Sequence, residues 1–342
     1  MSDGLNRRDL LRLSLATGAA LAAGDIFKIA EGANSQSYDN SGITAKSVDV
    51  SSLLGGFESL KVNSGDVQIN VRRAGRGKPV LLLHGYPETH LMWHKLAPRL
   101  AEKYAVILPD LRGYGDSSTP AGAEDHSNYS KRVMALDQIS VMEQLGFKTF
   151  DVIGHDRGAR VAHRLTRDYP DRVNRCVVMD IMPTLDMYEK TNLAFARGYY
   201  HWFFLVQPYD LPEHLIAGDP GYFLRWCLRS WSRNPGAFSE EAITEYIRCF
   251  TKPAVIHATC EDYRASAGID LEHDRHERYK KVQNPFLVLW GEKGFINRAY
   301  DVMGIWQQYA SNVQGKAIPS GHFLPEESPD ETYQAVIEFL GK

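Results

Sequence analysis

The apolar residues of this chain gather in short runs that recur between stretches with a helical repeat. Two runs around Gly65, at residues 59–62 and 67–71, indicate an antiparallel hairpin. Helical stretches are predicted at 91–103 and 129–145. The remaining runs are almost continuously apolar, as in strands buried on both faces, and they lie at 79–83, 105–108, 150–153, 173–181 and 285–291, with a shorter one at 316–318. This alternation predicts an α/β fold with a doubly wound, mainly parallel sheet.

The alternation stops between residues 183 and 280. This stretch has a helical pattern, is dense in aromatic residues and is interrupted by Pro208, Pro212, Pro220 and Pro235. An insertion of this kind predicts a helical cap whose apolar side covers the sheet. We therefore expect a core made of residues 45–182 and 281–342, with the cap at 183–280.

A strand, a sharp turn and a helix are predicted around residues 154–158, where the sequence reads Gly-His-Asp-Arg-Gly. Glycines on both sides of a nucleophile let the backbone bend tightly, which is the nucleophile elbow of the α/β-hydrolase fold. The central residue is Asp156. A carboxylate that attacks an alkyl carbon leaves an ester that water can cleave, so the motif favours carbon–halogen bonds or epoxides as substrates. The alternative, from the pentapeptide alone, is that Asp156 N-caps the following helix.

Two further residues complete the order expected of a catalytic triad. Asp180 and His322 each stand at the end of a predicted strand, and the carboxyl ends of parallel strands converge on one crevice. His322 would deprotonate the hydrolytic water, while Asp180 would orient the imidazole ring. Glu292, at the end of another predicted strand, is an alternative acid that we rank below Asp180.

An oxyanion hole is predicted from two backbone N–H groups. The loop at 84–87, His-Gly-Tyr-Pro, follows a buried strand and can offer the N–H of Tyr86. The residue after the nucleophile, Arg157, offers the second N–H.

Composition favours small-molecule chemistry. The chain has 39 basic and 42 acidic residues, so no broad basic field is available to attract nucleic acid or an acidic membrane. No metal and no cofactor are predicted, and a homodimer is an allowed assembly. The cysteines lack metal-ligand spacing and are expected to be buried, although two could pair in an exported protein; they are Cys176, Cys227, Cys249 and Cys260.

Residues 1–44 are predicted to lie outside the fold. Arg7 and Arg8 precede a short, alanine-rich apolar region, and a Ser/Asn/Gly-rich linker follows from residue 32 to residue 44. Adjacent arginines in this position are typical of a twin-arginine export signal; the alternative is a frayed basic helix. The apolar region is too short and interrupted to span a bilayer comfortably. We therefore expect a periplasmic or secreted protein, without stable membrane insertion after processing.

Five motifs carry a more specific resemblance. They lie at residues 84–90, 154–160, 200–202, 260–265 and 320–327, and they read HGYPETH, GHDRGAR, YHW, CEDYRA and SGHFLPEE. Together they resemble the fluoroacetate dehalogenases, which are haloacetate-hydrolysing members of the α/β-hydrolase superfamily. The similarity runs from about residue 80 to the C-terminus, and Arg157 stands where haloalkane dehalogenases typically have Trp.

The resemblance implies roles for five more side chains. Arg157 and Arg160 would hold the substrate carboxylate, and His201, Trp202 and Tyr263 would bind the departing halide. Their chemistry agrees, because guanidinium groups bind carboxylates in forked pairs and fluoride needs several donors aimed at its developing charge. The expected reaction is hydrolysis of fluoroacetate or chloroacetate to glycolate and halide through an aspartyl ester.

Two other functions stay open on the sequence. An epoxide hydrolase would share Asp156 and His322, and cap tyrosines such as Tyr263 would protonate the alkoxide. Arg157 and Arg160 disfavour it, because a neutral epoxide has no carboxylate to satisfy two buried cations. A non-catalytic ligand-binding protein of the same fold is the third alternative, and it would need neither Asp156 nor His322.

Overall fold

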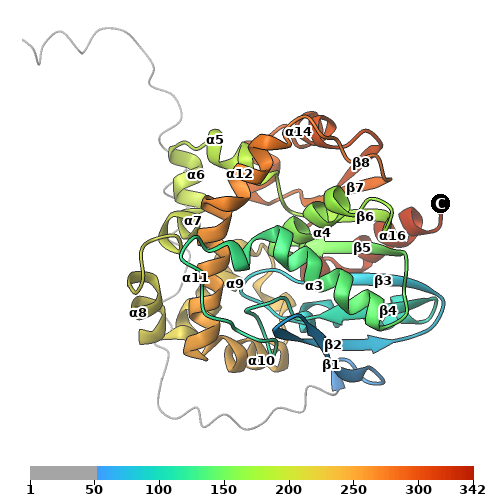
Figure 1. Cartoon of the computed structure of the whole chain (residues 1–342), viewed down its shortest axis with the longest axis horizontal. Helices are drawn as coiled ribbons and strands as arrows, with labels where there is room; N and C mark the ends of the chain where they lie inside the picture. Colours follow the sequence, from blue (N-terminus) through green and yellow to red (C-terminus); the bar gives the residue numbers. More distant parts are fainter. Residues whose placement is uncertain (1–51) are drawn as a thin grey trace, which may run out of the picture. The chain divides into compact units, whose positions relative to one another are not determined.

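An eight-stranded sheet lies at the centre of the computed structural model, which describes residues 52–342 (Figure 1). Its spatial order is β1-β2-β4-β3-β5-β6-β7-β8. β1 pairs antiparallel with β2 and β2 with β4, whereas all other neighbours are parallel. The predicted doubly wound, mainly parallel sheet is confirmed. The strands are β1 (Glu58–Ser64), β2 (Val67–Ala74), β3 (Lys78–Leu83), β4 (Tyr104–Pro109), β5 (Phe150–His155), β6 (Val173–Met179), β7 (Phe286–Gly291) and β8 (Val313–Ile318).

Helices between and after the strands cover the sheet. α3 and α4 contact each other, and α4 also contacts β3, β5 and β6 (Figure 1). These core helices are η3 (His90–Trp93), α2 (Ala97–Ala101), η4 (Ser127–Tyr129), α3 (Lys131–Gln144), α4 (Asp156–Asp168), α13 (Phe295–Ala299), α14 (Val302–Tyr309), α15 (Leu324–Glu327) and α16 (Pro329–Leu340). The single helix predicted at 91–103 is wrong, because η3 ends at Trp93 and α2 begins only at Ala97. Pro98 lies in the first turn of α2, where its missing N–H is tolerated, and so it starts a helix instead of continuing one.

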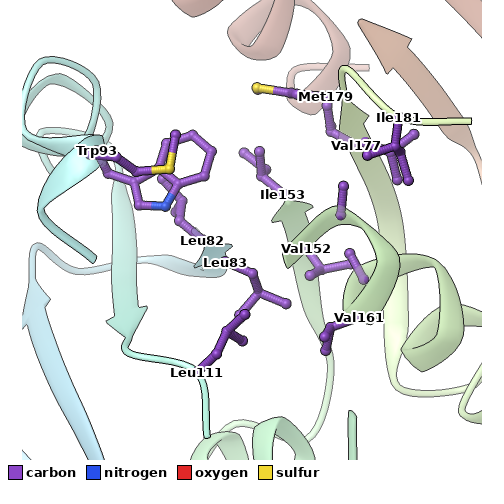
Figure 2. Close-up of a cluster of buried hydrophobic side chains, with 14 of the residues drawn as sticks. Leu82, Leu83, Trp93, Leu111, Val152, Ile153, Val161, Val177, Met179 and Ile181 are labelled. Atoms are coloured by element: carbon purple, nitrogen blue, oxygen red, sulfur yellow. The ribbon is translucent and has the colours of Figure 1, made fainter. Parts of the chain in front are cut away.

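The core is built from the predicted apolar runs. Figure 2 shows side chains of β3, β5 and β6 facing Trp93 and Val161 from the covering helices. The labelled strand residues are all buried, and they are Leu82, Leu83, Val152, Ile153, Val177 and Met179. Full burial of one such side chain contributes about 1.5–3 kcal/mol relative to exposure. The carboxyl ends of these strands are therefore firmly held.

The segment between β6 and β7 contains helices joined by loops, and none of the strands of the described chain. We call α5 to α12 the cap helices, and Figure 1 shows α7 to α11 gathered beside one end of the sheet. α11 runs through the interior and contacts α8, α10 and α12. The segments are α5 (Thr184–Glu189), α6 (Leu193–Gly198), α7 (Tyr200–Phe204), α8 (Leu211–Gly218), α9 (Pro220–Trp231), η5 (Pro235–Ala237), α10 (Glu240–Phe250), α11 (Pro253–Ala267) and α12 (Ile269–His276).

Three sequence expectations concern features outside the sheet. The export signal and linker at 1–44 lie outside the described residues. Within residues 52–342, no helix combines the length and the apolar character that a bilayer crossing requires. All four cysteines are buried and free, so none of them pairs with another.

Candidate active site

Asp156 stands at the sharp turn between β5 and α4. Its φ is 45°, in the left-handed region that residues other than glycine rarely adopt. A Cβ on Gly154 would lie 2.5 Å from the carbonyl oxygen of Gly158, and a Cβ on Gly158 would lie 2.3 Å from that of Leu83. Only glycine fits at both flanking positions, and the resulting turn holds Asp156 at the carboxyl end of the sheet.

The Asp156 carboxylate is buried and faces the loop after β3. Its Oδ1 accepts the backbone N–H of Tyr86 at 3.0 Å. The N-cap of α4 is His155, and no side chain caps this helix, so the alternative role of Asp156 as an N-cap is wrong. The Arg157 N–H lies in the first turn of α4, where no intrahelical carbonyl is available to it.

The charges around Asp156 keep it ionised. Burial alone would raise the pKa of its carboxyl group, but the positive charges of His322, Arg157, His155 and Arg160 lower that pKa to about 2. A carboxylate with this pKa is fully ionised at neutral pH, which is the form a nucleophile needs.

His322 lies between two carboxylates. Its Nδ1 is 2.6 Å from Asp180 Oδ2, and its Nε2 is 3.9 Å from Asp156 Oδ2. Asp180 is itself fixed, since its Oδ1 accepts the N–H of Gly291 at 2.9 Å. The side chain of Glu292 is exposed, and of the two acids considered from the sequence it is Asp180 that contacts the histidine.

The pKa of His322 reflects opposing effects. Burial lowers it, but the hydrogen bond and charge of Asp180, together with the charge of Asp156, raise it above its ordinary value. The backbone also holds this residue in place. The His322 N–H donates to the carbonyl of Trp231 in α9 at 3.2 Å, and His155 Nε2 is 2.8 Å from the His322 carbonyl oxygen.

Arg157 is fully buried and bound to the cap helix α11. Its Nε and Nη2 donate to Asp262 at 2.9 and 2.8 Å, in the forked geometry that guanidinium and carboxylate groups favour. Nη2 also donates to Ser266 Oγ at 2.5 Å. Nη1 has no acceptor among the described residues. Arg157 is therefore oriented by Asp262 and keeps one free buried donor.

Arg160, one helical turn further along α4, is held by neutral groups. Its Nη1 donates to the carbonyl of Met182 at 3.0 Å and to Thr184 Oγ1 at 2.8 Å. Burial and the nearby charge of Arg157 lower the pKa of its guanidinium. Nε finds no acceptor within residues 52–342. The prediction that a neutral substrate would leave two buried cations unsatisfied is wrong for Arg157, because Asp262 neutralises it. Of these two arginines, only Arg160 has no ion pair with a carboxylate of the described chain.

The side chains of His201, Trp202 and Tyr263 form a buried group. The ring centres of His201 and Tyr263 are 5.8 Å apart, and those of Trp202 and Tyr263 are 6.4 Å apart. Tyr263 also lies under the Arg157 guanidinium, with 4.0 Å between Cζ and the ring centre, and Trp202 lies 4.6 Å from that of Arg160. His201 Nδ1, Trp202 Nε1 and Tyr263 Oη have no partner in the described part of the chain.

Two of these donors are held neutral by burial. Desolvation lowers the pKa of His201 to about 3, and it raises the pKa of Tyr263 well above its ordinary value, to which the negative charge of Asp156 adds. At neutral pH both side chains therefore offer an uncharged N–H or O–H group to a ligand.

A cavity of about 200 Å³ reaches the triad. Its lining includes Asp156, Asp180 and His322, and His201 comes from the cap. The other predicted ligand-binding residues do not line it, and these are Arg157, Arg160, Trp202 and Tyr263. Their unpartnered polar atoms are buried in the described part of the chain.

Two acids that orient the site carry no role in the sequence prediction. Asp262 binds Arg157, and Glu327 accepts the N–H groups of Gly321 and Phe323, both at 2.9 Å, on either side of His322. Both acids lie inside the motifs at 260–265 and 320–327. Their position in these motifs was the only available signal. The residues next to a buried acid in the sequence do not show which distant residue it binds.

Comparison with known proteins agrees with this geometry. The family model described as the α/β hydrolase fold matches residues 78–329. The chain is 43% identical to a fluoroacetate dehalogenase of Burkholderia sp, over 83% of this chain and 94% of the relative. It is 35% identical to a soluble epoxide hydrolase of Corynebacterium sp. (strain C12), over 78% and 91% respectively. A crystal structure from Nostoc sp PCC 7120, assigned to the α/β hydrolases, is 57% identical and superposes with a TM-score of 0.83 over 84% of this chain and 99% of that one. The chain belongs to the α/β-hydrolase family.

Proposed function

We propose that the protein is a haloacetate dehalogenase, which hydrolyses fluoroacetate or chloroacetate to glycolate and halide. The observation that carries the proposal is a group of buried donors without a protein acceptor near an ionised aspartate. Buried donors are normally satisfied within the protein, so such a group is typical of a site for an anionic or strongly polar ligand. The donors are Arg157 Nη1, Arg160 Nε, His201 Nδ1, Trp202 Nε1 and Tyr263 Oη.

The first half-reaction is a displacement at carbon. An oxygen of Asp156 attacks the halogen-bearing carbon, a carbon–oxygen bond forms, and the halide leaves with the electrons of the carbon–halogen bond. Arg157 and Arg160 hold the substrate carboxylate through their free donors. The three ring donors of the cap stabilise the charge that develops on the halide. The 43% identical fluoroacetate dehalogenase supports this assignment.

The second half-reaction is hydrolysis of the ester on Asp156. His322 Nε2 lies 3.9 Å from Asp156 Oδ2, too far for a direct hydrogen bond, so the ring is free to bind and deprotonate a water. The hydroxide attacks the ester carbonyl, and the N–H of Tyr86, already directed at Asp156 Oδ1, stabilises the oxyanion together with that of Arg157. Asp180 stabilises the imidazolium, which gives its proton to the departing alkoxide oxygen as the bond between that oxygen and the carbonyl carbon breaks. Glycolate leaves, and the Asp156 carboxyl group loses a proton to regenerate the carboxylate.

Halide release tests the proposal directly. We expect the protein to release fluoride from fluoroacetate and chloride from chloroacetate, and we expect freshly purified Asp156→Asn to release neither, because the attacking oxyanion is gone. An ion-selective electrode measures both halides. Absence of halide with the wild type, or turnover by the variant near the wild-type rate, would refute the proposal.

Two observations favour epoxide hydrolysis as the second candidate. Tyr263 offers a buried O–H that could protonate an alkoxide, and Asp262 already compensates the charge of Arg157, so a neutral substrate would leave only Arg160 unpaired. The Corynebacterium relative is a soluble epoxide hydrolase. Styrene oxide and chloroacetate should be compared side by side. Equal efficiency with both, unaffected by Arg160→Met, would favour the epoxide reaction.

A further inference from the structure

Three arginines line the outer part of the cavity that reaches Asp156. Arg197 lies in α6, Arg233 follows α9, and Arg298 lies in α13. All three side chains are exposed, unlike the buried Asp156 and His322 that line the same cavity. Cationic side chains from three separate segments therefore line the solvent-exposed part of this cavity.

None of these arginines is neutralised by the protein. No carboxylate of residues 52–342 forms an ion pair with Arg197, Arg233 or Arg298. The Arg233 guanidinium donates only to carbonyl oxygens, those of Ser230, Ser232 and Lys293 at 3.2, 2.9 and 3.3 Å. Burial and the positive charge of Arg298 lower the pKa of Arg233, and the charge of Glu327 opposes this effect only in part.

The segment that carries Arg233 is hydrogen-bonded to the loop that carries His322. The backbone N–H groups of Arg233 and Asn234 donate to Glu327 at 2.7 and 3.1 Å. The same carboxylate holds the residues on either side of His322. A second contact joins the segments that carry the other two arginines, because the ring of Tyr199, which follows α6, lies 5.0 Å from that of Phe295 in α13. These contacts hold the positively charged Arg233 and Arg298 near each other, and a bound anion would reduce the repulsion between them.

The cavity also exceeds the needs of a haloacetate. A haloacetate has five heavy atoms, which would fill roughly 150 Å³ even if each took the ~30 Å³ share of a liquid water molecule. The cavity volume, about 200 Å³, is larger than this. A substituent on the reacting carbon therefore has room to extend toward the three arginines.

We propose that Arg197, Arg233 and Arg298 form a second anion subsite, and that the substrate class includes 2-halo dicarboxylic acids such as 2-chlorosuccinate. The inference rests on the proposed dehalogenation. Arg157 and Arg160 hold the carboxylate next to the reacting carbon, and the second carboxylate lies beside the three arginines of the subsite. Asp156 displaces chloride from carbon 2, and hydrolysis of the ester yields the 2-hydroxy diacid.

A binding experiment tests the subsite without chemistry. Trp226 and Trp231 line the cavity, so their fluorescence reports on ligands that enter it. We expect succinate to bind the full-length protein at least tenfold more tightly than butyrate at equal ionic strength, and Arg233→Gln/Arg298→Gln to remove the difference. Arg248→Gln is the matched control, because Arg248 pairs with Asp116 and Glu245 and does not line the cavity. Equal binding of succinate and butyrate by the wild type would overturn the proposal.

Kinetics then separates the subsite from the reaction itself. We expect kcat/KM for 2-chlorosuccinate to exceed that for 2-chlorobutyrate, which has the same chain length, by tenfold or more. The Arg233→Gln/Arg298→Gln variant should lose this preference, with kcat/KM falling at least tenfold more for 2-chlorosuccinate than for chloroacetate. Turnover of chloroacetate without a preference for the diacid, or a preference that survives in the variant, refutes the subsite alone. If no haloacid yields halide, the proposed function fails, and the succinate titration still decides whether the subsite binds anions.

Discussion

Asp156 and His322 have different proton requirements in the proposed reaction. Displacement by a carboxylate needs no proton transfer, whereas hydrolysis of the ester needs a base. In His322→Asn we therefore expect one equivalent of halide followed by arrest, with an ester on Asp156. Intact mass spectrometry after incubation with chloroacetate should show one added carboxymethyl group. A halide burst without this mass gain would contradict the assignment. Glu292→Gln, which changes the exposed acid, should behave as the wild type.

The pKa values of the same two residues predict how the steps separate with pH. The pKa of Asp156 is about 2, and that of His322 is raised above its ordinary value by Asp180. As pH falls through the His322 pKa, the base is lost while the nucleophile stays ionised. In the ester intermediate Asp156 carries no charge, but Asp180 still lies beside the His322 ring and still raises the pKa of His322.

At pH 5 we therefore expect a halide burst equal to the enzyme concentration, followed by a steady-state rate that falls about tenfold per pH unit below the His322 pKa. Rapid-quench measurements at pH 5 and pH 8 check this, with circular dichroism to verify that the fold persists. Loss of the burst together with the steady state would show that the displacement also needs a neutral His322.

In the proposed reaction, Arg160 favours substrates that carry a carboxylate over neutral ones. A hydrogen bond to a charged group is typically worth about 1.5–3 kcal/mol, so Arg160→Met should lower kcat/KM for chloroacetate about tenfold or more. Chloroacetamide should react far more slowly than chloroacetate with the wild type, because a neutral amide leaves the buried guanidinium uncompensated. Steady-state chloride release measures both effects. Equal rates for the two substrates would remove the basis for a carboxylate site.

At the level of elements, the Arg157–Asp262 pair joins the core helix α4 to the cap helix α11. Asp262 also binds Lys131 and accepts the Tyr114 hydroxyl at 2.6 Å, so its removal leaves buried Arg157 without a carboxylate and leaves buried Lys131 with only Asp270, 3.6 Å away. We expect Asp262→Ala to lower the free energy of unfolding by about 3–5 kcal/mol. Urea denaturation measures the change. Glu189→Ala is the control, since the Glu189–Arg278 pair is exposed and such pairs are worth about 0–1 kcal/mol.

The same elements show what a sequence can predict. Uninterrupted apolar runs identified the buried strands, and strand ends brought Asp156, Asp180 and His322 to one edge, because parallel strands share a direction. Local pattern could not place the break before Pro98, where a helix start resembles a helix interior. Nor could it pair Arg157 with Asp262, since these residues are 105 positions apart and many acids were candidates. The arginines around the cavity were invisible for the same reason, because they come from three distant segments.

For the whole molecule, the distribution of charge matters more than its sum. The net charge of −3 would weakly repel an anionic substrate. Arg197, Arg233 and Arg298 bring positive charge to the cavity, which is also lined by Asp156 and Asp180, and Arg160 adds a buried cation that forms no ion pair with a carboxylate of residues 52–342. An excess of positive charge in a cleft raises the local concentration of negatively charged ligands. A negative net charge is thus compatible with the proposed anionic substrates, because positive charge is concentrated at the cavity.

Export also concerns the molecule as a whole. All the proposed site residues lie between Tyr86 and His322, so the twin-arginine-like segment within residues 1–44 is free to serve as an address. In a bacterial host with a twin-arginine pathway, we expect the chain to be exported and shortened at its N-terminus. Replacing both Arg7 and Arg8 with Lys should retain it at full length in the cytoplasm with unchanged activity, because the substitution preserves charge and touches no site residue. Cell fractionation, N-terminal sequencing of the exported protein and a halide assay on each fraction test this. Export of the double variant at the wild-type level, or retention of the wild type, would show that the segment is not such a signal.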